Sequence, residues 1–176
     1  MIRFHFLLTL LLLIANISLG QSFKVTCSER ERKNADSKYP DLIKTCFIKN
    51  YKFVQTFSTD NVGRYVNSEE EVYVYLDKKY IKTNNSKVFN KKQDTLILII
   101  NNKIQQGFKK NKSDSTVNEC LRGFDSIPIY KMNDLEISFQ NDEIQFGIDW
   151  GLRYACGPVN GVTVSFKLSE IEKYLR

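Results

Sequence analysis

The sequence has almost no histidine. Its 176 residues include one, His5, which lies in an N-terminal segment with the features of a cleaved leader. A mature chain without histidine excludes Ser-His-Asp and Cys-His nucleophile systems, ordinary zinc sites, the two-histidine iron triad and histidine-based acid–base catalysis. The GxSxG elbow, the P-loop, a GxGxxG turn after a strand and the EF-hand loop are also missing. We therefore expect no cofactor and no metal, and a binding protein rather than an enzyme.

Long hydrophobic runs are scarce, and the one that stands out is N-terminal. Arg3 precedes an apolar run over residues 6–17, and Ser18 and Gly20 supply the small residues of a cleavage site. This order predicts a signal peptide over residues 1–20. The run is shorter than the about 20 residues that span a bilayer, and no later stretch is apolar for longer than a strand. We expect a secreted, extracellular protein without a transmembrane segment, the alternative being an uncleaved N-terminal anchor.

Free thiols are not expected. The four cysteines, Cys27, Cys46, Cys120 and Cys156, are an even set in an oxidising compartment, which predicts two disulfides. No CxxC or CxH spacing indicates a metal site. Three pairings are open, and we favour Cys27–Cys46 with Cys120–Cys156 because each closes a shorter loop.

Charge of one sign is only mildly in excess. The formal net charge is +6, or +5 once Arg3 is removed. The basic residues fall into short clusters: Arg30/Arg32/Lys33, Lys78/Lys79, Lys91/Lys92 and Lys109/Lys110/Lys112. None reaches a polybasic tract of about five to eight residues, so solvated loops and strand edges are the favoured interpretation. The alternative is a patch for acidic glycans or anionic membranes, whereas nucleic acid is not an expected partner of an exported protein.

Two N-glycosylation sequons begin at Asn84 and Asn111. Both lie in hydrophilic, lysine-rich stretches that we expect to be exposed.

The mature chain has the length of one domain with a single core. Residues 21–45 are charged and weakly patterned, and we expect a short helix or an irregular N-terminal arm held by Cys27. Residues 46–176 predict a mainly β, antiparallel sandwich or jelly-roll-like domain that ends in a short helix, where Ser169 and Glu172 have capping-box spacing. The candidate strands are 51–57, 72–76, 96–100, 127–130 and 162–168.

The clearest local prediction is a hairpin over residues 135–148. With Asn141-Asp142 as a two-residue turn, Ile137 lies opposite Phe146, and the apolar residues of both strands share one face. A slip of one residue would bury the acidic face, so the register is well specified.

This hairpin resembles a strand pair of the farnesoic acid O-methyltransferase-type domain, which carries an aromatic-x-Ile-x-Trp strand, a polar turn and Ile-x-Val-Gly. The run over 72–77 is similar to an early strand of that family. Leu96 to Ile100, followed by Asn101-Asn102-Lys103 and Lys109-Lys110, resembles its strand, turn and paired basic residues. The similarity covers about residues 70 to 150.

This chain also departs from the family. Asn101-Asn102-Lys103 replaces its Gly-Gly-Trp turn, Phe139 replaces a tryptophan, and a late Gly-Trp-Gly segment is reduced to Trp150-Gly151. The resemblance implies an extracellular β-sandwich module. It implies neither methyl transfer nor any catalytic residue, because the domain type lacks a dinucleotide-type cofactor fold.

Aromatic residues are more numerous than one small core can cover. The surplus consists of Tyr73, Tyr75, Tyr80, Tyr130, Trp150 and Tyr154. These residues cover a second sheet face or the rim of the core, or they form a stacking platform for a sugar or an apolar ligand. We expect the platform at Trp150, Arg153 and Tyr154, because a loop that leaves a rigid strand is a usual place for recognition. Lys109, Lys110 and Lys112, expected in a loop, would attract an anionic ligand.

The sequence thus favours a secreted, disulfide-stabilised binding module for an extracellular glycan, small apolar molecule or protein. One alternative is a secreted effector of the venom, salivary or defence type that acts on a membrane or a host factor. Another is a carboxylate-based hydrolase, because a glycosidase needs only two acids at a suitable separation. Glu136, Glu143 and Asp149 are the candidate acids.

Overall fold

The computed structural model describes residues 24–114, 118–152, 156 and 160–176, so the predicted signal peptide lies outside the described residues. The strands are β1 (Thr26–Arg32), β2 (Asp41–Ile48), β3 (Tyr51–Thr59), β4 (Tyr65–Leu76), β5 (Lys79–Thr83), β6 (Glu136–Gln140), β7 (Glu143–Asp149) and β8 (Gly161–Lys167). The α-helices are α2 (Asn85–Val88), α3 (Gln93–Ser113) and α4 (Leu168–Ile171), and the 3₁₀ helices are η1 (Asn118–Leu121), η2 (Met132–Asp134) and η4 (Glu172–Tyr174).

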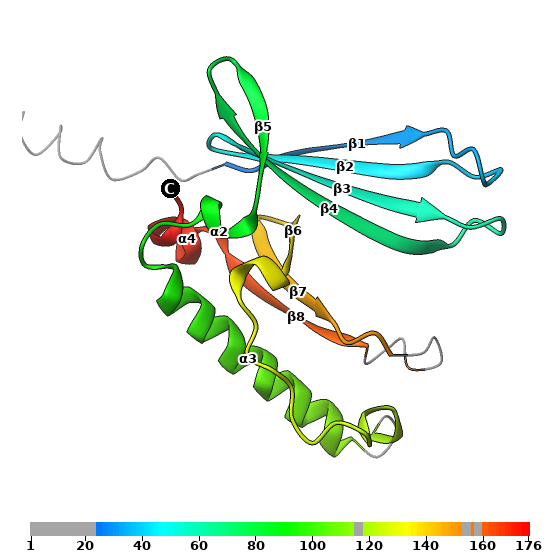
Figure 1. Ribbon diagram of the computed structural model, residues 1–176, viewed down its shortest axis with the longest axis vertical. Coiled ribbons are helices and arrows are strands. Elements are labelled where there is room, and N and C mark those ends of the chain that lie inside the picture. Colours follow the sequence, from blue (N-terminus) through cyan, green and yellow to red (C-terminus); the bar gives the residue numbers. More distant parts are fainter. Residues whose placement is uncertain (1–23, 115–117, 153–155, 157–159) are drawn as a thin grey trace, which may run out of the picture.

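The strands form two antiparallel sheets. The first has five strands in the order β1-β2-β3-β4-β5, and the second has three in the order β6-β7-β8. Helix α3 packs against β8 of the second sheet, and its buried residues join the same core as the apolar face of that sheet (Figure 1). This architecture confirms the predicted mainly β, antiparallel fold.

The second sheet contains the predicted hairpin. Strands β6 and β7 pair Ile137 with Phe146, as expected. Asn141 and Asp142 form the turn with φ values of 49° and 62°, the left-handed conformation that a type I′ turn requires. The buried side chains lie on one face of the hairpin, so the alternation was sufficient to fix the register.

Helix α3 corrects one predicted strand. Residues 96–100 lie in this helix, whose buried face carries Leu96, Ile100, Ile104 and Phe108. Their spacing of four residues is that of one helix face. The strand prediction was wrong because a window of five apolar residues cannot distinguish a strand from part of a buried helix.

The segment 127–130 is also not a strand, because side chains of α3 take the place of a partner strand. The Asn101 amide accepts a hydrogen bond from Tyr130 N at 2.8 Å and donates one to Tyr130 O at 2.9 Å. Gln105 Nε2 donates to Ile127 O at 3.1 Å. The backbone polar groups of this segment are thus satisfied outside any sheet.

The expected N-terminal arm is a strand over much of its length. Residues 26–32 form β1, which pairs with β2 along its whole length, so the expectation of a helix or an irregular arm was wrong for this part. The predicted boundary between residues 45 and 46 falls inside β2. Opposite charges alternate along Glu29–Arg32, which suits a solvated edge strand and left no apolar periodicity from which to predict it.

Both favoured disulfides are present. Cys27 and Cys46 are directly opposite each other in β1 and β2, and their bond ties the edge strand to its neighbour. Cys120 of η1 is bonded to Cys156, which follows β7. The described residues contain no free cysteine.

The C-terminal helix is present as α4, with a different cap. Glu170 accepts a hydrogen bond from Lys167 N at 2.9 Å, so the helix begins before Ser169 rather than at the predicted Ser169–Glu172 box.

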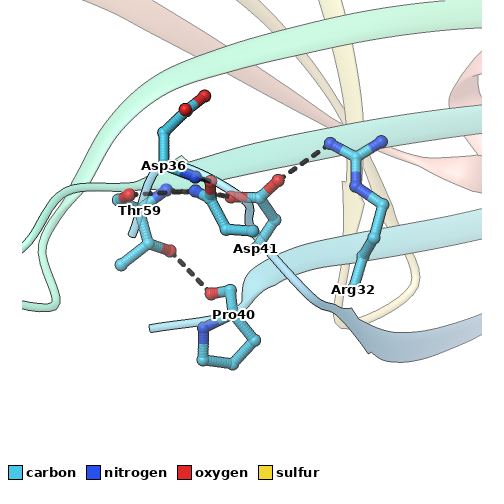
Figure 2. Close-up of polar contacts among 6 residues, drawn as sticks. Arg32, Asp36, Pro40, Asp41 and Thr59 are labelled. Atoms are coloured by element: carbon cyan, nitrogen blue, oxygen red, sulfur yellow. Dashed lines mark hydrogen bonds and ion pairs between the residues drawn. The ribbon is translucent and has the colours of Figure 1, made fainter. Parts of the chain in front are cut away.

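A buried aspartate stabilises the end of the first sheet at which β1 and β3 finish and β2 begins (Figure 2). Asp41 is 5% exposed and accepts hydrogen bonds from Arg32 at 2.8 Å, Asn34 at 2.7 Å and Thr59 N at 3.2 Å. The Arg32 hydrogen bond and charge hold the pKa of Asp41 below its usual value. These bonds fix the connection between β1 and β2 against the end of β3.

The two sheets meet at β6. The Phe53 ring on the first sheet packs edge-on against Phe139 with centroids 4.9 Å apart, and Lys44 Nζ donates to Phe139 O at 2.8 Å. The core therefore lies between the inner face of the first sheet, the apolar face of the second and α3.

Candidate functional site

The structure places Trp150, the first of the predicted binding residues, against the end of α3. Its ring packs edge-on against Phe108, with centroids 5.5 Å apart, and the side chain is half-buried. Arg153 and Tyr154 lie outside the described residues. The half-buried position gives Trp150 a packing role at the rim of the core.

The predicted basic loop is the last turn of α3. Lys109 and Lys110 are exposed, and a cation at a helix C-terminus is favoured by the helix dipole. Lys112 is occupied, because its Nζ donates to Phe124 O at 2.5 Å and lies 3.8 Å from Asp125 Oδ1. The loop expectation was wrong, because these lysines continue the helix that begins at Gln93.

Trp150 and Lys112 both contact the Phe108 ring. Lys112 Nζ lies 5.9 Å from the centroid of the Phe108 ring that Trp150 also contacts. Both are held by protein groups, which makes them poor candidates for a free ligand contact. Their role in binding, like that of Lys109 and Lys110, stays a prediction.

The two sequons differ in exposure. Asn84 is exposed immediately before α2, whereas Asn111 is half-buried within α3. Asn84 is therefore the better placed of the two for a glycan, and glycosylation stays a prediction.

A more open group of aromatic and basic side chains lies on the outward face of the first sheet. In the strand register Phe47 is opposite Lys52, Lys52 is opposite Tyr73, and Tyr73 is opposite Lys82. In the next row, Tyr75 is opposite Tyr80. We call these residues the aromatic face: Phe47, Lys52, Tyr73, Tyr75, Tyr80 and Lys82.

The rings of the aromatic face surround a lysine. Lys52 Nζ lies 4.3 Å from the centroid of Tyr73 and 4.7 Å from that of Tyr80, which is cation–π geometry. Tyr80 contacts Tyr75 at 5.0 Å and Phe47 at 6.1 Å between centroids. These contacts order the rings while leaving Tyr75 44% and Tyr80 41% exposed.

The carboxylate of Glu71 partly neutralises the positive charge of the aromatic face. Glu71 pairs with Lys82 at 2.6 Å and accepts a hydrogen bond from the Tyr73 hydroxyl at 2.7 Å. The hydrogen bond from Lys82 lowers the pKa of Glu71, and the same bond raises the pKa of Lys82. With two lysines to one carboxylate, the face has a positive balance.

The β4–β5 hairpin, which bears Tyr73, Tyr75, Tyr80 and Lys82, projects beyond the other strands of the first sheet (Figure 1). Asp77 and Lys78 form its turn with φ values of 48° and 64°. Beside this turn Leu76 is 50% and Ile81 40% exposed. The projecting hairpin therefore combines apolar and basic side chains.

The tyrosines of this face belong to the surplus aromatics of the sequence, but the predicted platform lay at Trp150, Arg153 and Tyr154. The available signal was the alternation over 72–76, in which both sets of side chains are apolar or aromatic. That pattern predicts a strand with two apolar faces, and it does not say which face remains uncovered.

The carboxylates proposed for a hydrolase are not all close together. Glu143 pairs with Gln140 and Glu136 with Gly147, so the two glutamates are separated by four residues along the hairpin. That spacing is about 13 Å, beyond the separation of the two acids in glycosidases. Asp149 is nearer to Glu136, and its charge together with burial raises the pKa of Glu136.

Two further searches of the described part of the chain were negative. No group of three or more histidine, cysteine, aspartate or glutamate side chains there is arranged to hold a metal ion. No helix there is long and apolar enough to span a membrane.

Comparisons with known proteins found no relative. No family model, no curated protein and no solved structure matches this chain. The resemblance to the farnesoic acid O-methyltransferase-type domain therefore stays a prediction, and function has to be argued from the site.

Proposed function

We propose that this protein is a secreted, disulfide-stabilised binding module that recognises an acidic extracellular glycan through its aromatic face, and that it is not an enzyme. The observation that carries this proposal is Lys52 held between the half-buried Tyr73 ring and the exposed Tyr80 ring on the outward face of the first sheet. Such a face offers stacking and positive charge together.

The chemistry of an acidic sugar fits this arrangement. The C–H groups of a pyranose ring give it an apolar side that stacks on an aromatic ring, and Tyr75 and Tyr80 present such rings to solvent. Lys52 and Lys82 lie beside them and would attract sulfate or carboxylate groups. The rings lie on paired strands, so little conformational entropy is lost on binding.

Retention of the mature protein on immobilised heparin tests the proposal. We expect retention that weakens steeply with salt, because exposed charges are screened. Tyr80→Ala and Lys52→Ala should each elute at lower salt, and Lys110→Ala, an exposed lysine on α3, should elute unchanged.

Two results would contradict the assignment. Absence of retention removes the acidic glycan as ligand. Loss of retention in Lys110→Ala but not in Tyr80→Ala moves the binding surface to the end of α3, where the sequence had located it. A glycan array then identifies the sugar.

A second candidate is an effector that acts on an anionic membrane. The exposed Leu76 and Ile81 beside Lys78 and Lys79 favour it, because apolar side chains flanked by lysines bind membrane interfaces. Leakage from vesicles containing anionic lipid, abolished by Leu76→Ser, would favour this function. Unchanged vesicles at high protein concentration would exclude it.

A further inference from the structure

An acidic cleft lies where β4, β5, α2, η2 and β6 meet, and it shares Lys82 with the aromatic face. Its volume is about 300 Å³. Four carboxyl groups line it, those of Glu70, Glu71, Asp134 and Glu136, whereas Lys82 is the one cation among the described lining residues. A locally negative cleft stands out in a chain whose net charge is +6.

Two side chains at the base of the cleft are fixed by the edge of β6. Glu70 accepts a hydrogen bond from Ile137 N at 2.5 Å, and Asn85 Nδ2 donates to Leu135 O at 2.7 Å. The second contact sets the orientation of the Asn85 amide, since the reversed amide would place two acceptor oxygens together. Both side chains are thereby held in place before any ligand arrives.

The remaining oxygens of these two side chains are unpartnered. Glu70 Oε1 and Asn85 Oδ1 are buried, and neither has a hydrogen-bond partner among the described residues. The Asn85 side chain is in hydrogen-bonding range of Glu70, and Asn85 as a whole is 8% exposed. Buried acceptors without donors cost free energy, so this pair calls for a donor from outside the chain or for a proton on Glu70.

The other charged groups facing Glu70 are engaged or acidic. Lys82 is paired with Glu71 at 2.6 Å, and Asp134 accepts a hydrogen bond from Lys131 N at 2.7 Å. Glu136 adds negative charge from β6. The cleft therefore offers acceptors and negative charge to an incoming group.

We propose that this cleft binds a small organic cation, a primary ammonium or guanidinium group whose N–H donors reach Glu70 Oε1 and Asn85 Oδ1. An ammonium group carries three N–H donors and a guanidinium group five, enough to supply both oxygens. A metal ion fits less well, because the described residues supply no set of three acidic, histidine or cysteine ligands.

Binding of a cation at this position is coupled to a proton. Burial raises the pKa of Glu70 to about 7, so near neutral pH the carboxyl is partly protonated. The ammonium group requires the ionised form, and the displaced proton passes to solvent. Affinity should therefore rise between about pH 6 and about pH 8, with release of up to one proton per ligand.

Isothermal titration of the mature protein with n-butylammonium, guanidinium and tetramethylammonium ions tests the proposal. All three carry one positive charge, but tetramethylammonium has no N–H donor. We expect the first two to bind and to raise the melting temperature, and tetramethylammonium to bind about tenfold or more weakly. Equal binding of all three contradicts a donor-specific site. Absence of binding at about pH 8 shows that the two oxygens are satisfied by a proton or by water, and overturns the proposal.

Three glutamate variants test where the n-butylammonium ion binds. Glu70→Gln should lower the affinity for n-butylammonium about tenfold or more, because it removes the charged acceptor. Glu136→Gln, at the exposed rim, leaves the fold intact and should lower it several-fold. Glu143→Gln is the matched control, a glutamate of the same hairpin outside the cleft. An equal loss in Glu143→Gln would reduce the effect to net charge.

The cation site and the proposed glycan surface can be tested separately, although Lys82 borders both. Tyr80→Ala should leave n-butylammonium binding unchanged, and Glu136→Gln should leave heparin retention unchanged. Failure of either proposal can therefore be recognised without the other.

Discussion

The solvated faces of the two sheets differ in kind. The outward face of the second sheet carries Glu136, Ser138 and Gln145, the polar set that an antiparallel sheet with one buried face is expected to have. The outward face of the first sheet carries exposed tyrosines, including Tyr75 and Tyr80, around a lysine. Folding requires only the first arrangement, so the exposed tyrosines of the first sheet are the feature on which the proposed glycan binding rests.

The largest expected effect is a difference in unfolding free energy between variants of the inner and the outer aromatic residues of the first sheet. Phe53→Ala, on the inner face, should lower the free energy of unfolding by about 3–5 kcal/mol because the 1% exposed ring leaves a cavity. Tyr80→Ala, on the outer face, should lower it by less than about 1 kcal/mol. Urea unfolding measures both. A loss in Tyr80→Ala as large as that in Phe53→Ala would make the aromatic face structural.

The next effect concerns Glu70, where the inner face of the first sheet meets β6. Its pKa of about 7 in the folded protein lies above the ordinary value of 4.5, so the folded state binds the proton more tightly than the unfolded state. The contribution of Glu70 to the free energy of unfolding should therefore be largest below about pH 4.5. As the pH rises to about 7 it should fall by about 3 kcal/mol, and then level off.

The difference in unfolding free energy between wild type and Glu70→Gln isolates this effect from the other carboxyl groups. Glutamine cannot ionise and can donate to Asn85 Oδ1, so the variant should be the more stable protein at about pH 8. A difference independent of pH would show that Glu70 titrates as an exposed acid.

A smaller effect is expected where α3 packs on β8. A Cβ atom added to Gly107 would lie 2.9 Å from Val162 Cγ2. Gly107→Ala should therefore lower the free energy of unfolding by about 1–2 kcal/mol through overpacking, although alanine is the better helix former. The double variant Gly107→Ala with Val162→Ala should recover part of the loss. A stabilised single variant would show that helix and strand are less closely packed.

The smallest effect concerns the charge of the aromatic face. Glu71→Gln removes the carboxylate that pairs with Lys82 and leaves the lysine to a ligand. We expect little change in melting temperature, because exposed ion pairs contribute little, and slightly later elution from heparin. Earlier elution would mean that Glu71 positions Tyr73 or Lys82 for binding.

Local patterns predicted the parts of the fold in which neighbouring residues fix the answer. The hairpin register followed from strict alternation around Asn141-Asp142, and the disulfides followed the shortest loops. Helix α3 was missed at Leu96–Ile100 because its buried face repeats every four residues, beyond a five-residue window. Segment 127–130 has the composition of a strand but obtains its hydrogen bonds from α3.

The candidate sites were less predictable than the fold. The tyrosines were recognised as surplus, yet their position beside Lys52 depends on pairing between β3, β4 and β5. Glu70 and Asn85 could not be recognised as site residues from the sequence, because each belongs to an ordinary polar stretch. Their unpartnered oxygens exist only because β6, distant in sequence, takes up the other polar atoms of both side chains.

By itself the sequence determined the mainly β class, the alternating hairpin and the absence of histidine from the described residues. These follow from residue type and short-range periodicity, which persist whatever the rest of the chain does. The tertiary structure alone decided which tyrosines stay exposed and which oxygens are buried without a donor. Exposure and hydrogen-bond satisfaction depend on contacts between segments far apart in the chain, and those contacts form only when the two sheets and α3 pack together.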